Sequence, residues 1–529
     1  MALLSFCLMG NVAVAQEIFE SSNGLFEYML DENQKVIITS YLGNSKELVV
    51  PSQIDGYDVR TLAEYAIFSK VLTTLDVSSI KVFEVESIFC PKLSTLTLGD
   101  AESVAVGYVG SSSNLTKVIF KSANVPANAC NGFSALKEVN FEGITSIGNY
   151  AFNGCSSLTG ELSLSISNIG SYAFAGTGYE VAMFYNIEKL PVGVLTNASN
   201  LKSVVATGIK EIGNFALKNC DALNNMTAYY VESVGTSAFE DCDAITTSTL
   251  AFSKVKRIGD KAFYKSSLDG TLTFSENLEA VGSQAFANTR LDAVVLKSNP
   301  SMCADAFNNS NMLTLEISDA TELDYSNTNA YGKVRYTRNT MTQSVTGARK
   351  YAGLILPFVP VANEDYVFYQ LNSSSNGTEV VFDRVDSPVA NTPYLFEYLG
   401  STGAVTFESN GAVTIGGSNT HEFTAGSWKA TGVYNKQAKT SNGKLYSIKG
   451  GEFTRYENNL TVNPYRVYWT APTANAIKFR NGSDDVTEVE LAEIEDVNIP
   501  ATYYDLTGRR VLEPVKGNLY IVNGKKVVY

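Results

Sequence analysis

Apolar and polar positions recur at a fixed spacing through roughly the first 300 residues of the chain. The most regular phrase reads I-G-x-x-A-F, and it begins at Ile147, Ile169, Val234, Ile258 and Val281. With weaker copies included, twelve such points from Leu62 to Met302 lie about 22 residues apart on average. A unit of this length cannot bury its apolar face alone, so the pattern predicts coils stacked in a solenoid.

Each repeat contains one predicted strand and one return segment. In the strand, Val139 and Phe141 alternate with polar Asn140, so Asn140 is expected on the opposite face. The chain then turns, and the I-G-x-x-A-F phrase directs its apolar side chains back at the strand. Gly148 is expected to allow a tight bend or a close approach of neighbouring coils. The period lies in the range of leucine-rich repeats, which predicts a mainly β solenoid of about 12 coils.

The outward slots of the predicted strands are candidates for a binding surface. They hold few charged residues, although charged side chains dominate ordinary protein surfaces. Methionine and exposed aromatic residues are enriched in binding sites. Strand propensity alone would also select Thr, Val and Tyr here, and this alternative stays open. The candidate ligand-binding residues are Met183, Tyr185 and Tyr229, expected on one patch, with Asn140 and Thr227; Thr97 has the same outward phase.

The repeat phase is lost after Asn329, where short β-rich runs separated by Asn, Gly, Ser and Pro begin. These runs predict one antiparallel domain, a sandwich or a barrel, over residues 331–482. Four aromatic residues of this domain could stack on sugar rings, but packing in a core is the favoured reading. They are Trp428, Trp469, Tyr465 and Tyr468.

The end of the chain is acidic and then rich in turns. Residues 484–496 contain 7 Asp or Glu and no Lys or Arg, which indicates a solvated linker or a sheet edge. Beyond them, Gly508, Gly517 and Asn523–Gly524 are expected turns between three short strands, because Asn-Gly is a strong hairpin signal.

Composition narrows the chemistry. The chain has 529 residues, a net charge of −14 and a single histidine, His421. The acidic balance argues against nucleic acid as a partner. One histidine excludes histidine triads and multi-histidine metal sites, and the sequence has no nucleophile elbow or phosphate loop. Two carboxylates suffice for a glycosidase, so composition leaves one open in the β domain. We predict no catalytic residue, no metal and no cofactor.

Six cysteines follow the N-terminal segment: Cys90, Cys130, Cys155, Cys220, Cys242 and Cys303. Four of them share one repeat phase, which fits a small buried apolar side chain. Cys220 and Cys242 lie on adjacent coils, where a disulfide could form in an oxidising space. Because Cys90 and Cys155 occupy the same phase without an adjacent partner, we predict free thiols.

The N-terminus predicts export. Residues 2–15 are apolar and end in A-V-A before Gln16, which is typical of a secretory signal peptide over residues 1–15. The segment departs from the usual pattern because no Lys or Arg precedes the apolar run, and a buried strand is the alternative. No later stretch reaches the ~18 apolar residues that a membrane helix needs.

Two parts of the sequence resemble known families. The consensus I-G-x-x-A-F-x-x-C-x-x-L-x-x-V-x-F resembles the BspA-like leucine-rich repeat family over roughly residues 24–320. This resemblance implies a solenoid on secreted or surface-attached bacterial proteins, commonly linked to adhesion, and identifies no ligand. The end, Y-D-L-x-G-R-R-V and then G-x-L-Y-I-V-N-G-K-K-V, resembles tails of exported proteins of anaerobic Gram-negative bacteria. Some of those tails are type nine secretion sorting signals, and a small structural β cap is the alternative.

These observations predict five segments: a signal peptide (1–15), an N-terminal β cap (16–58), a leucine-rich repeat solenoid (59–330), an antiparallel sandwich-like β domain (331–482), and an acidic linker with a C-terminal β tail (483–529). The predicted function is a non-enzymatic, secreted or cell-surface binding or adhesion protein. Its expected partner is a host or microbial protein or glycan, and the chain is expected to be a monomer. The alternatives are glycan binding or processing through residues 331–482, or a structural component of the envelope.

Overall fold

The computed structural model describes residues 17–110, 113–247, 253–308, 312–319, 321–339, 350–377, 379–400, 403–440, 444–449, 452–456 and 459–471, followed by the strands 476–481, 485–490, 492–493, 503–504, 510–511, 519–522 and 525–528. The chain forms two compact units. Unit 1 comprises residues 1–295 and 300–309, and unit 2 comprises residues 296–299 and 310–529. Within the described residues no α-helix occurs, so the chain is all β, as predicted.

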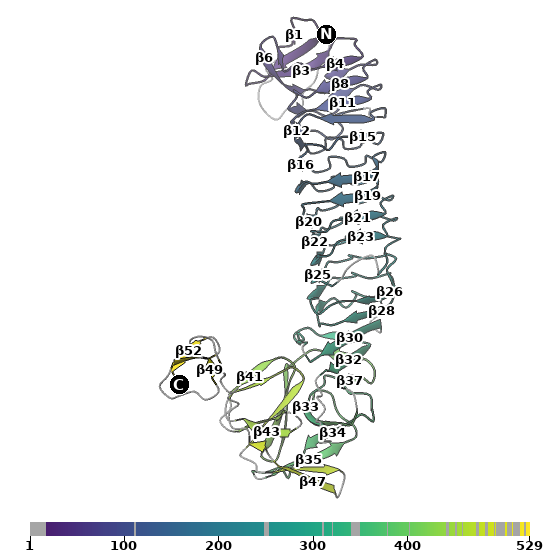
Figure 1. Cartoon of the computed structure of the whole chain (residues 1–529). Coiled ribbons are helices and arrows are strands. Elements are labelled where there is room, and N and C mark those ends of the chain that lie inside the picture. The colour runs from purple at the N-terminus through teal and green to yellow at the C-terminus, as the bar shows by residue number, and fades with distance from the viewer. Residues whose placement is uncertain are drawn as a thin grey trace, which may run out of the picture. The chain divides into compact units, whose positions relative to one another are not determined.

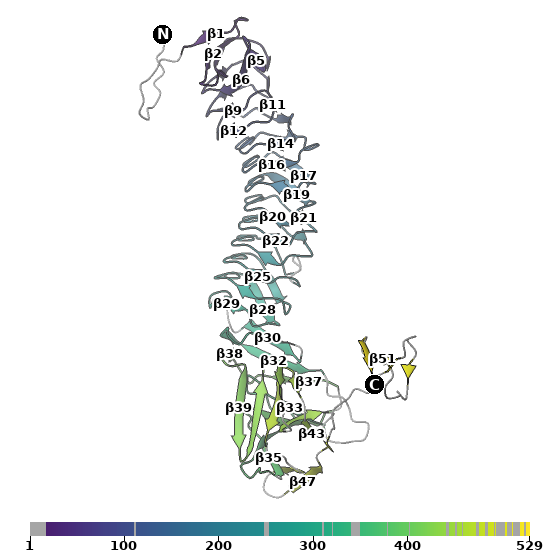
Figure 2. The ribbon, with the colours of Figure 1, turned by 90° about the vertical axis from the view of Figure 1, so that its left-hand side faces the viewer.

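Unit 1 is a solenoid of about 13 turns, which confirms the predicted fold (Figure 1). Its first column of strands runs from coil to coil along the unit (Figure 2). Within the repeats these strands hold the start of the I-G-x-x-A-F phrase, and most are two residues long. They are β1 (Phe19–Glu20), β2 (Phe26–Leu30), β3 (Val36–Tyr41), β6 (Tyr57–Leu62), β9 (Val82–Phe83), β12 (Ser103–Val104), β14 (Asn124–Val125), β16 (Ser146–Ile147), β18 (Asn168–Ile169), β20 (Lys189–Leu190), β22 (Glu211–Ile212), β24 (Ser233–Val234), β25 (Arg257–Ile258), β27 (Ala280–Val281) and β29 (Ser301–Met302).

A second column holds the L-x-x-V-x-F strands, which pair in parallel from coil to coil. Its strands are β4 (Glu47–Val49), β8 (Thr74–Val77), β11 (Thr95–Leu98), β13 (Lys117–Phe120), β15 (Glu138–Val139), β17 (Thr159–Leu164), β19 (Gly178–Phe184), β21 (Ser203–Val205), β23 (Asn225–Thr227), β26 (Asp269–Thr273) and β28 (Arg290–Leu296). Short strands β5 (Gln53–Ile54), β7 (Ile67–Phe68) and β10 (Ile88–Phe89) lie beside the first coils.

The parallel stacking begins one coil before the twelve repeats counted in the sequence. Strand β3 pairs in parallel with β6, and β4 pairs in parallel with β8. Ahead of them, β1 pairs antiparallel with β2, and β2 pairs antiparallel with β3. The antiparallel strands therefore close the N-terminal end of the solenoid, where an open stack would expose unpaired backbone groups.

The glycine of each repeat is required by the close approach of neighbouring coils. A Cβ added to Gly148 would lie 2.4 Å from the backbone nitrogen of Ala127 in the preceding coil. At Gly235 the added Cβ would lie 2.6 Å from the nitrogen of Asn214. Of the two roles expected for Gly148, close approach is therefore the one that the coil packing enforces.

Charged side chains in the first column alternate in sign from coil to coil. Glu188, Lys210, Glu232 and Lys256 occupy the same slot of four successive coils. Lys210 lies 3.8 Å from Glu188, and Lys256 lies 2.8 Å from Glu232. Each exposed pair contributes little stability, but a shifted register would place like charges side by side, so the ladder favours one alignment of the coils.

Unit 2 consists mainly of antiparallel sheets. Its strands are β30 (Leu313–Ser318), β31 (Asn329–Tyr331), β32 (Lys333–Arg338), β33 (Lys350–Leu354), β34 (Tyr366–Leu371), β35 (Glu379–Val385), β36 (Tyr394–Tyr398), β37 (Val405–Glu408), β38 (Val413–Ile415), β39 (Thr420–Ala425), β40 (Trp428–Val433), β41 (Gln437–Lys439), β42 (Leu445–Lys449), β43 (Glu452–Tyr456), β44 (Leu460–Val462), β45 (Arg466–Thr470), β46 (Ala476–Asn481), β47 (Asp485–Glu490) and β48 (Ala492–Glu493). Two six-stranded sheets, β33-β36-β34-β35-β46-β47 and β39-β40-β45-β42-β43-β48, make up most of it.

These two sheets pack face to face, as expected for a sandwich-like domain. The ring of Phe382 on β35 meets that of Trp469 on β45 edge-on, with 6.1 Å between centroids. A Cβ added to Gly353 on β33 would lie 2.9 Å from the carbonyl oxygen of Val467 on β45. Not every pairing is antiparallel, because β35 and β46 run in parallel.

Among its described residues the predicted C-terminal tail contains four short strands, one more than expected: β49 (Tyr503–Tyr504), β50 (Arg510–Val511), β51 (Leu519–Val522) and β52 (Lys525–Val528). Val522 of β51 lies opposite Lys525 of β52, so the last two strands form a hairpin. The proposed turn residues Gly508, Gly517 and Asn523–Gly524 lie outside the described residues, as does the predicted signal peptide at residues 1–15.

Candidate functional site

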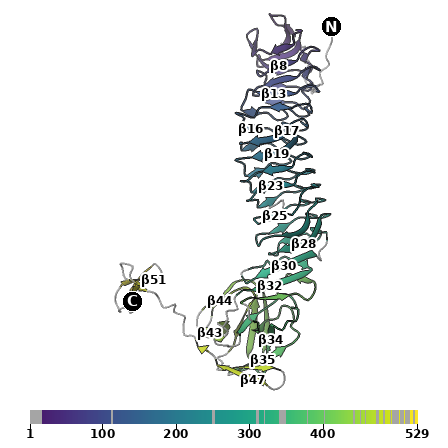
Figure 3. The same cartoon turned by 45° about the vertical axis from the view of Figure 1, so that its right-hand side comes forward.

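Most of the candidate binding residues lie on the outer face of one sheet, β17-β19-β21-β23. Figure 3 shows where strands β17, β19 and β23 of this sheet lie along the solenoid. Met183 on β19 is in register with Val205 on β21, and Val205 is in register with Thr227 on β23. Their sequence neighbours Ala182, Val204 and Met226 are buried, so this second set points inward. The alternation places Met183 and Thr227 in one outward row, in half-buried positions.

The two tyrosines continue this face beyond the ends of the strands. Tyr185 follows Met183 by two residues, and Tyr229 follows Thr227 by two residues. Their side chains are 43% and 58% exposed. The Tyr185 hydroxyl donates a hydrogen bond to the Met183 sulfur over 3.5 Å, so the Tyr185 ring leans back over its own strand. The structure therefore brings Met183, Tyr185, Thr227 and Tyr229 onto one surface.

Asn140 is not part of this sheet. It follows β15, which belongs to the sheet β15-β13-β11-β8-β4. Its side chain is exposed, as predicted, but its Oδ1 accepts a hydrogen bond of 2.9 Å from the backbone N–H of Glu142. This amide therefore stabilises a local turn at the end of its strand.

Thr97 is an exception to the predicted outward exposure, since its side chain is only 7% exposed. It lies on β11, between Asp76 on β8 and Ile119 on β13. Lys121, just after β13, forms an ion pair of 2.6 Å with Asp76. This pair joins the coils on either side of β11, so it covers Thr97 from outside.

One residue of the face was missed by sequence reasoning. Tyr230 is 55% exposed and adjoins Tyr229, but it lies after β23, where strand alternation no longer applies. The pair of adjacent tyrosines in the sequence is the signal that could have indicated a second exposed ring here. On the neighbouring coil, Gly208 follows Thr207 and adds no side chain beside the tyrosines.

The aromatic residues considered for sugar stacking in unit 2 are core residues. Trp428, Trp469 and Tyr465 are buried almost completely, and Tyr468 is buried as well. The Trp428 indole N–H donates a hydrogen bond of 2.8 Å to the carbonyl of Asn376. These side chains therefore pack inside unit 2 and offer no face to an external sugar, which confirms the favoured reading.

All six described cysteines are free thiols, as predicted, and Cys220 and Cys242 form no disulfide. Thiols in the shared phase donate weak hydrogen bonds to carbonyls of the preceding coil. Cys155 reaches the carbonyl of Cys130 over 3.0 Å, and Cys242 reaches that of Leu217 over 3.1 Å. Burial raises the pKa of both Cys155 and Cys242 to about 12, so these thiols stay protonated and serve packing.

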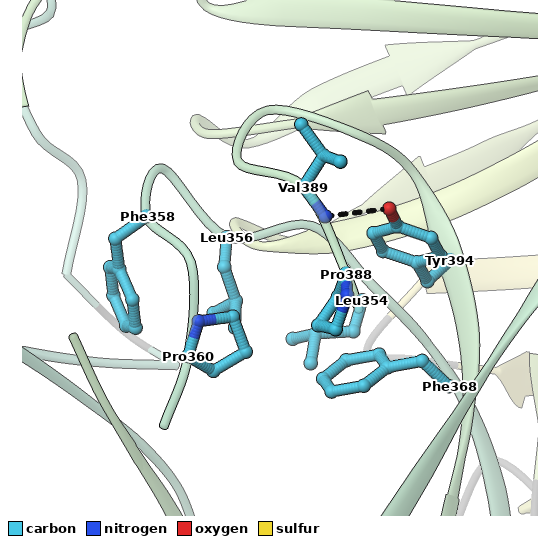
Figure 4. Close-up of a pocket in the computed structure, with 8 residues that line it drawn as sticks. All are labelled: Leu354, Leu356, Phe358, Pro360, Phe368, Pro388, Val389 and Tyr394. Atoms are coloured by element: carbon cyan, nitrogen blue, oxygen red, sulfur yellow. Dashed lines mark hydrogen bonds between the residues drawn. The ribbon is translucent and has the colours of Figure 1, made fainter. Parts of the chain in front are cut away.

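An apolar pocket in unit 2 offers no reactive group. It is lined by Leu354, Leu356, Phe358, Pro360, Phe368, Pro388, Val389 and Tyr394 (Figure 4). Its one polar side chain, the Tyr394 hydroxyl, accepts a hydrogen bond of 2.9 Å from the backbone N–H of Val389. Elsewhere in the part of the chain that is described, no three His, Cys, Asp or Glu side chains gather closely enough to hold a metal ion. Nor does any described helix have the length and apolar character needed to span a membrane.

Comparisons with known proteins identify the repeats. The model of the BspA type leucine rich repeat region matches residues 123–245 and 188–314, with 6 copies of the repeat. No curated protein gives a match. Three solved structures cover 58% of this chain each. They are a leucine rich cell surface protein from Faecalibacterium prausnitzii (15% identical, 90% of that chain covered, TM-score 0.30), a leucine-rich repeat protein from Bacteroides ovatus (16%, 71%, 0.34), and the pneumococcal vaccine antigen PcpA (15%, 94%, 0.33). From the family match and the stacked coils together, we conclude that residues 123–314 are a leucine-rich repeat region of the BspA type.

Proposed function

We propose that this chain is a non-enzymatic binding protein of the cell surface, which binds a macromolecule through the outer face of the sheet β17-β19-β21-β23. The observation that carries the proposal is the exposure of Tyr185 and Tyr229 on coils two apart, beside half-buried Met183. Soluble proteins seldom group large exposed aromatic side chains without a partner for them. The BspA type of the repeats supports a surface location.

The dimensions of the face favour a large ligand. Adjacent coils are about 4.8 Å apart in the strand-pairing direction, so the four coils of this sheet span about 15 Å between their outer strands. A surface built across four strands of one sheet suits a polymer or a protein better than a small metabolite, which binds in a concave pocket. A stacked-coil protein extends such a surface simply by adding repeats.

The proposal is tested by changing Met183, Tyr185 and Tyr229 together to serine in the full chain. Binding to an array of host matrix proteins and microbial glycans is measured alongside the melting temperature. We expect lost binding with an unchanged melting temperature. Unchanged binding rejects the face as the binding surface, and a large drop in melting temperature would mean that these side chains belong to the core.

A matched control separates a specific loss from a general effect of removing surface aromatics. Tyr57 is 38% exposed at the hairpin of β5 and β6, far along the solenoid from β19. Tyr57→Ser should leave binding to the same array unchanged.

A further inference from the structure

The binding face lies in a window without charge that runs across three successive coils. Residues 181–187, 203–209 and 225–231 contain no Asp, Glu, Lys, Arg or His. Charged residues directly flank both ends of the first two runs, at Glu180, Glu188, Lys202 and Lys210. The neighbouring coil on one side, with β17, carries exposed Glu161 in register with Val181. On this side the neutral stretch therefore ends at the coil of β17.

The charged residues that border the window neutralise each other between coils. On one border, Lys202 lies 2.7 Å from Glu180. On the other border, Lys210 lies 3.8 Å from Glu188. A charged ligand on the face would thus find no opposite charge inside the window. At the borders it would find only charges that are already paired.

The side chains that point out of the window are uncharged: tyrosine, threonine and asparagine side chains lie beside the half-buried Met183 and Val205. Val205 separates Met183 from Thr227 in the register. Exposed Thr207 lies two residues after Val205, on the coil between those of Tyr185 and Tyr229. Two coil spacings put these tyrosines about 10 Å apart. Because Gly208 adds no side chain next to Thr207, no large side chain projects from this coil between the two tyrosines.

Small polar groups of the window form neutral hydrogen bonds between adjacent coils. The Asn225 amide donates to the Ser203 hydroxyl over 3.3 Å, and the Asn186 amide donates to the Ser165 hydroxyl over 2.9 Å. Hydroxyl and amide groups both donate and accept hydrogen bonds. Sugar hydroxyls need partners of this kind, whereas the apolar C–H face of a sugar ring packs against an aromatic ring.

We propose that the ligand of this face is a neutral glycan, whose sugar rings stack on Tyr185 and Tyr229 while its hydroxyls bond to groups such as those of Thr207 and Thr227. This inference rests on the proposed function, because it assigns the ligand class of the same surface. The charged pairs at the borders of the window, Lys202 with Glu180 and Lys210 with Glu188, are already formed between coils. The face itself is therefore left with ring stacking and neutral hydrogen bonds as its means of binding.

The test measures binding of the full chain to two sets of immobilised probes. The neutral set is dextran, mannan, xylan and a β-1,3-glucan; the comparison set is heparin, polygalacturonate, fibronectin and collagen. We expect binding to at least one neutral polysaccharide, with the same affinity at low and high salt, because no ion pairs are involved. Tyr185→Ser and Tyr229→Ser should each weaken it about tenfold, as expected for the loss of one stacked ring.

Control variants make the result specific. Tyr185→Phe and Tyr229→Phe keep the ring and should retain most of the affinity, and Tyr57→Ser should retain all of it. No binding to any neutral polysaccharide overturns the inference. Binding to heparin, polygalacturonate or a protein that depends on Tyr185 and Tyr229 also overturns it but leaves the proposed function standing. Binding that is insensitive to both tyrosines overturns inference and function together.

Discussion

The ring of Phe152 stacks on the ring of Phe174 in the next coil, with 5.3 Å between centroids and 11° between planes. Phe152 also meets Phe141 edge-on at 5.4 Å, and its side chain is fully buried. The same slot stacks Phe239, Phe263, Phe286 and Phe307 further along the solenoid. The repeated phenylalanine therefore forms two stacks in the core that neighbouring coils share, separated by the coils that carry Leu195 and Leu217 in this slot.

Removing this ring should destabilise unit 1. Phe152→Ala leaves a cavity between two coils, and we expect a loss of about 3–5 kcal/mol in the free energy of unfolding. Replacing exposed Asn140 with alanine removes only its turn hydrogen bond with Glu142 and should cost about 1 kcal/mol or less. Urea unfolding followed by far-UV circular dichroism measures both. Equal midpoints for the two variants would show that the assigned repeat phase is wrong.

Gly148→Ala should destabilise unit 1, although alanine is ordinarily more favourable than glycine in regular secondary structure. The added methyl group would meet the backbone of Ala127 at 2.4 Å, and backbone cannot move aside without separating the coils. Overpacking of this kind costs about 1–3 kcal/mol. Gly208→Ala is the matched control, because its added carbon would lie 3.5 Å from the nearest atom, the carbonyl of Ile187. A melting temperature lowered equally by both variants would argue against close approach as the reason for the glycine.

Thiol labelling should separate Cys303 from the other described cysteines. Cys303 is exposed, whereas Cys90, Cys130, Cys155, Cys220 and Cys242 are buried. Burial raises the pKa of Cys90 to about 11, so little reactive thiolate is available at neutral pH even where reagent can enter. Brief iodoacetamide treatment of the native chain should modify Cys303 alone among these six, as read by peptide mass spectrometry. All six should react after unfolding without reductant, and failure of Cys220 and Cys242 to react then would reveal a disulfide.

An ion pair inside unit 2 should make its stability depend on pH. Asp319 lies 3.0 Å from Arg466 and accepts a hydrogen bond of 2.6 Å from the Tyr336 hydroxyl. Burial opposes ionisation of Asp319, but Arg466 and this hydrogen bond outweigh it and hold the pKa of the carboxyl below its usual value. Because the folded pKa is lowered, the stabilisation is present above about pH 4 and is lost as the pH falls through the folded pKa.

Asp319→Asn should therefore lower the stability of unit 2 by about 3 kcal/mol at neutral pH, since it leaves a partly buried Arg466 without its carboxylate. Both tryptophans of the chain, Trp428 and Trp469, are buried in unit 2, so tryptophan fluorescence follows this unit. The difference from the unchanged chain should shrink below about pH 4. A difference that is constant down to pH 3 would contradict the assigned role of the carboxylate.

The sequence predicted what repetition makes visible. A pattern that repeats in each coil predicts the burial of Phe152, the outward phase of Tyr185 and the free thiols. The burial of Thr97 could not be read in this way, because it depends on Lys121 reaching across a coil to Asp76. The exposure of Tyr230 was not predicted, because Tyr230 lies beyond the end of its strand, where alternation no longer indicates the direction of a side chain.

The neutral window could not be predicted from the sequence either, because it depends on which stretches become neighbours in the fold. Residues 181–187 and 225–231 are ordinary short neutral runs until the parallel register places them on one face with residues 203–209. In unit 2 no repeat exists to fix a phase, so the aromatic strands indicated a β domain without showing which rings are inside. Trp428 and Trp469 are enclosed because two sheets pack together, and strand patterns alone do not say how sheets pair.

Hydroxyl-radical footprinting tests the central claim most directly. The full chain is oxidised alone and in complex with a macromolecule that it binds in the panels described above. Oxidation of each tyrosine is quantified by mass spectrometry. If the sheet β17-β19-β21-β23 is the binding surface, ligand should protect Tyr185, Tyr229 and Tyr230, while Tyr57, Tyr65 and Tyr150, which are also exposed in unit 1, stay as reactive as before. Protection confined to Tyr57, Tyr65 or Tyr150, with Tyr185 and Tyr229 fully reactive in the bound state, would contradict the account.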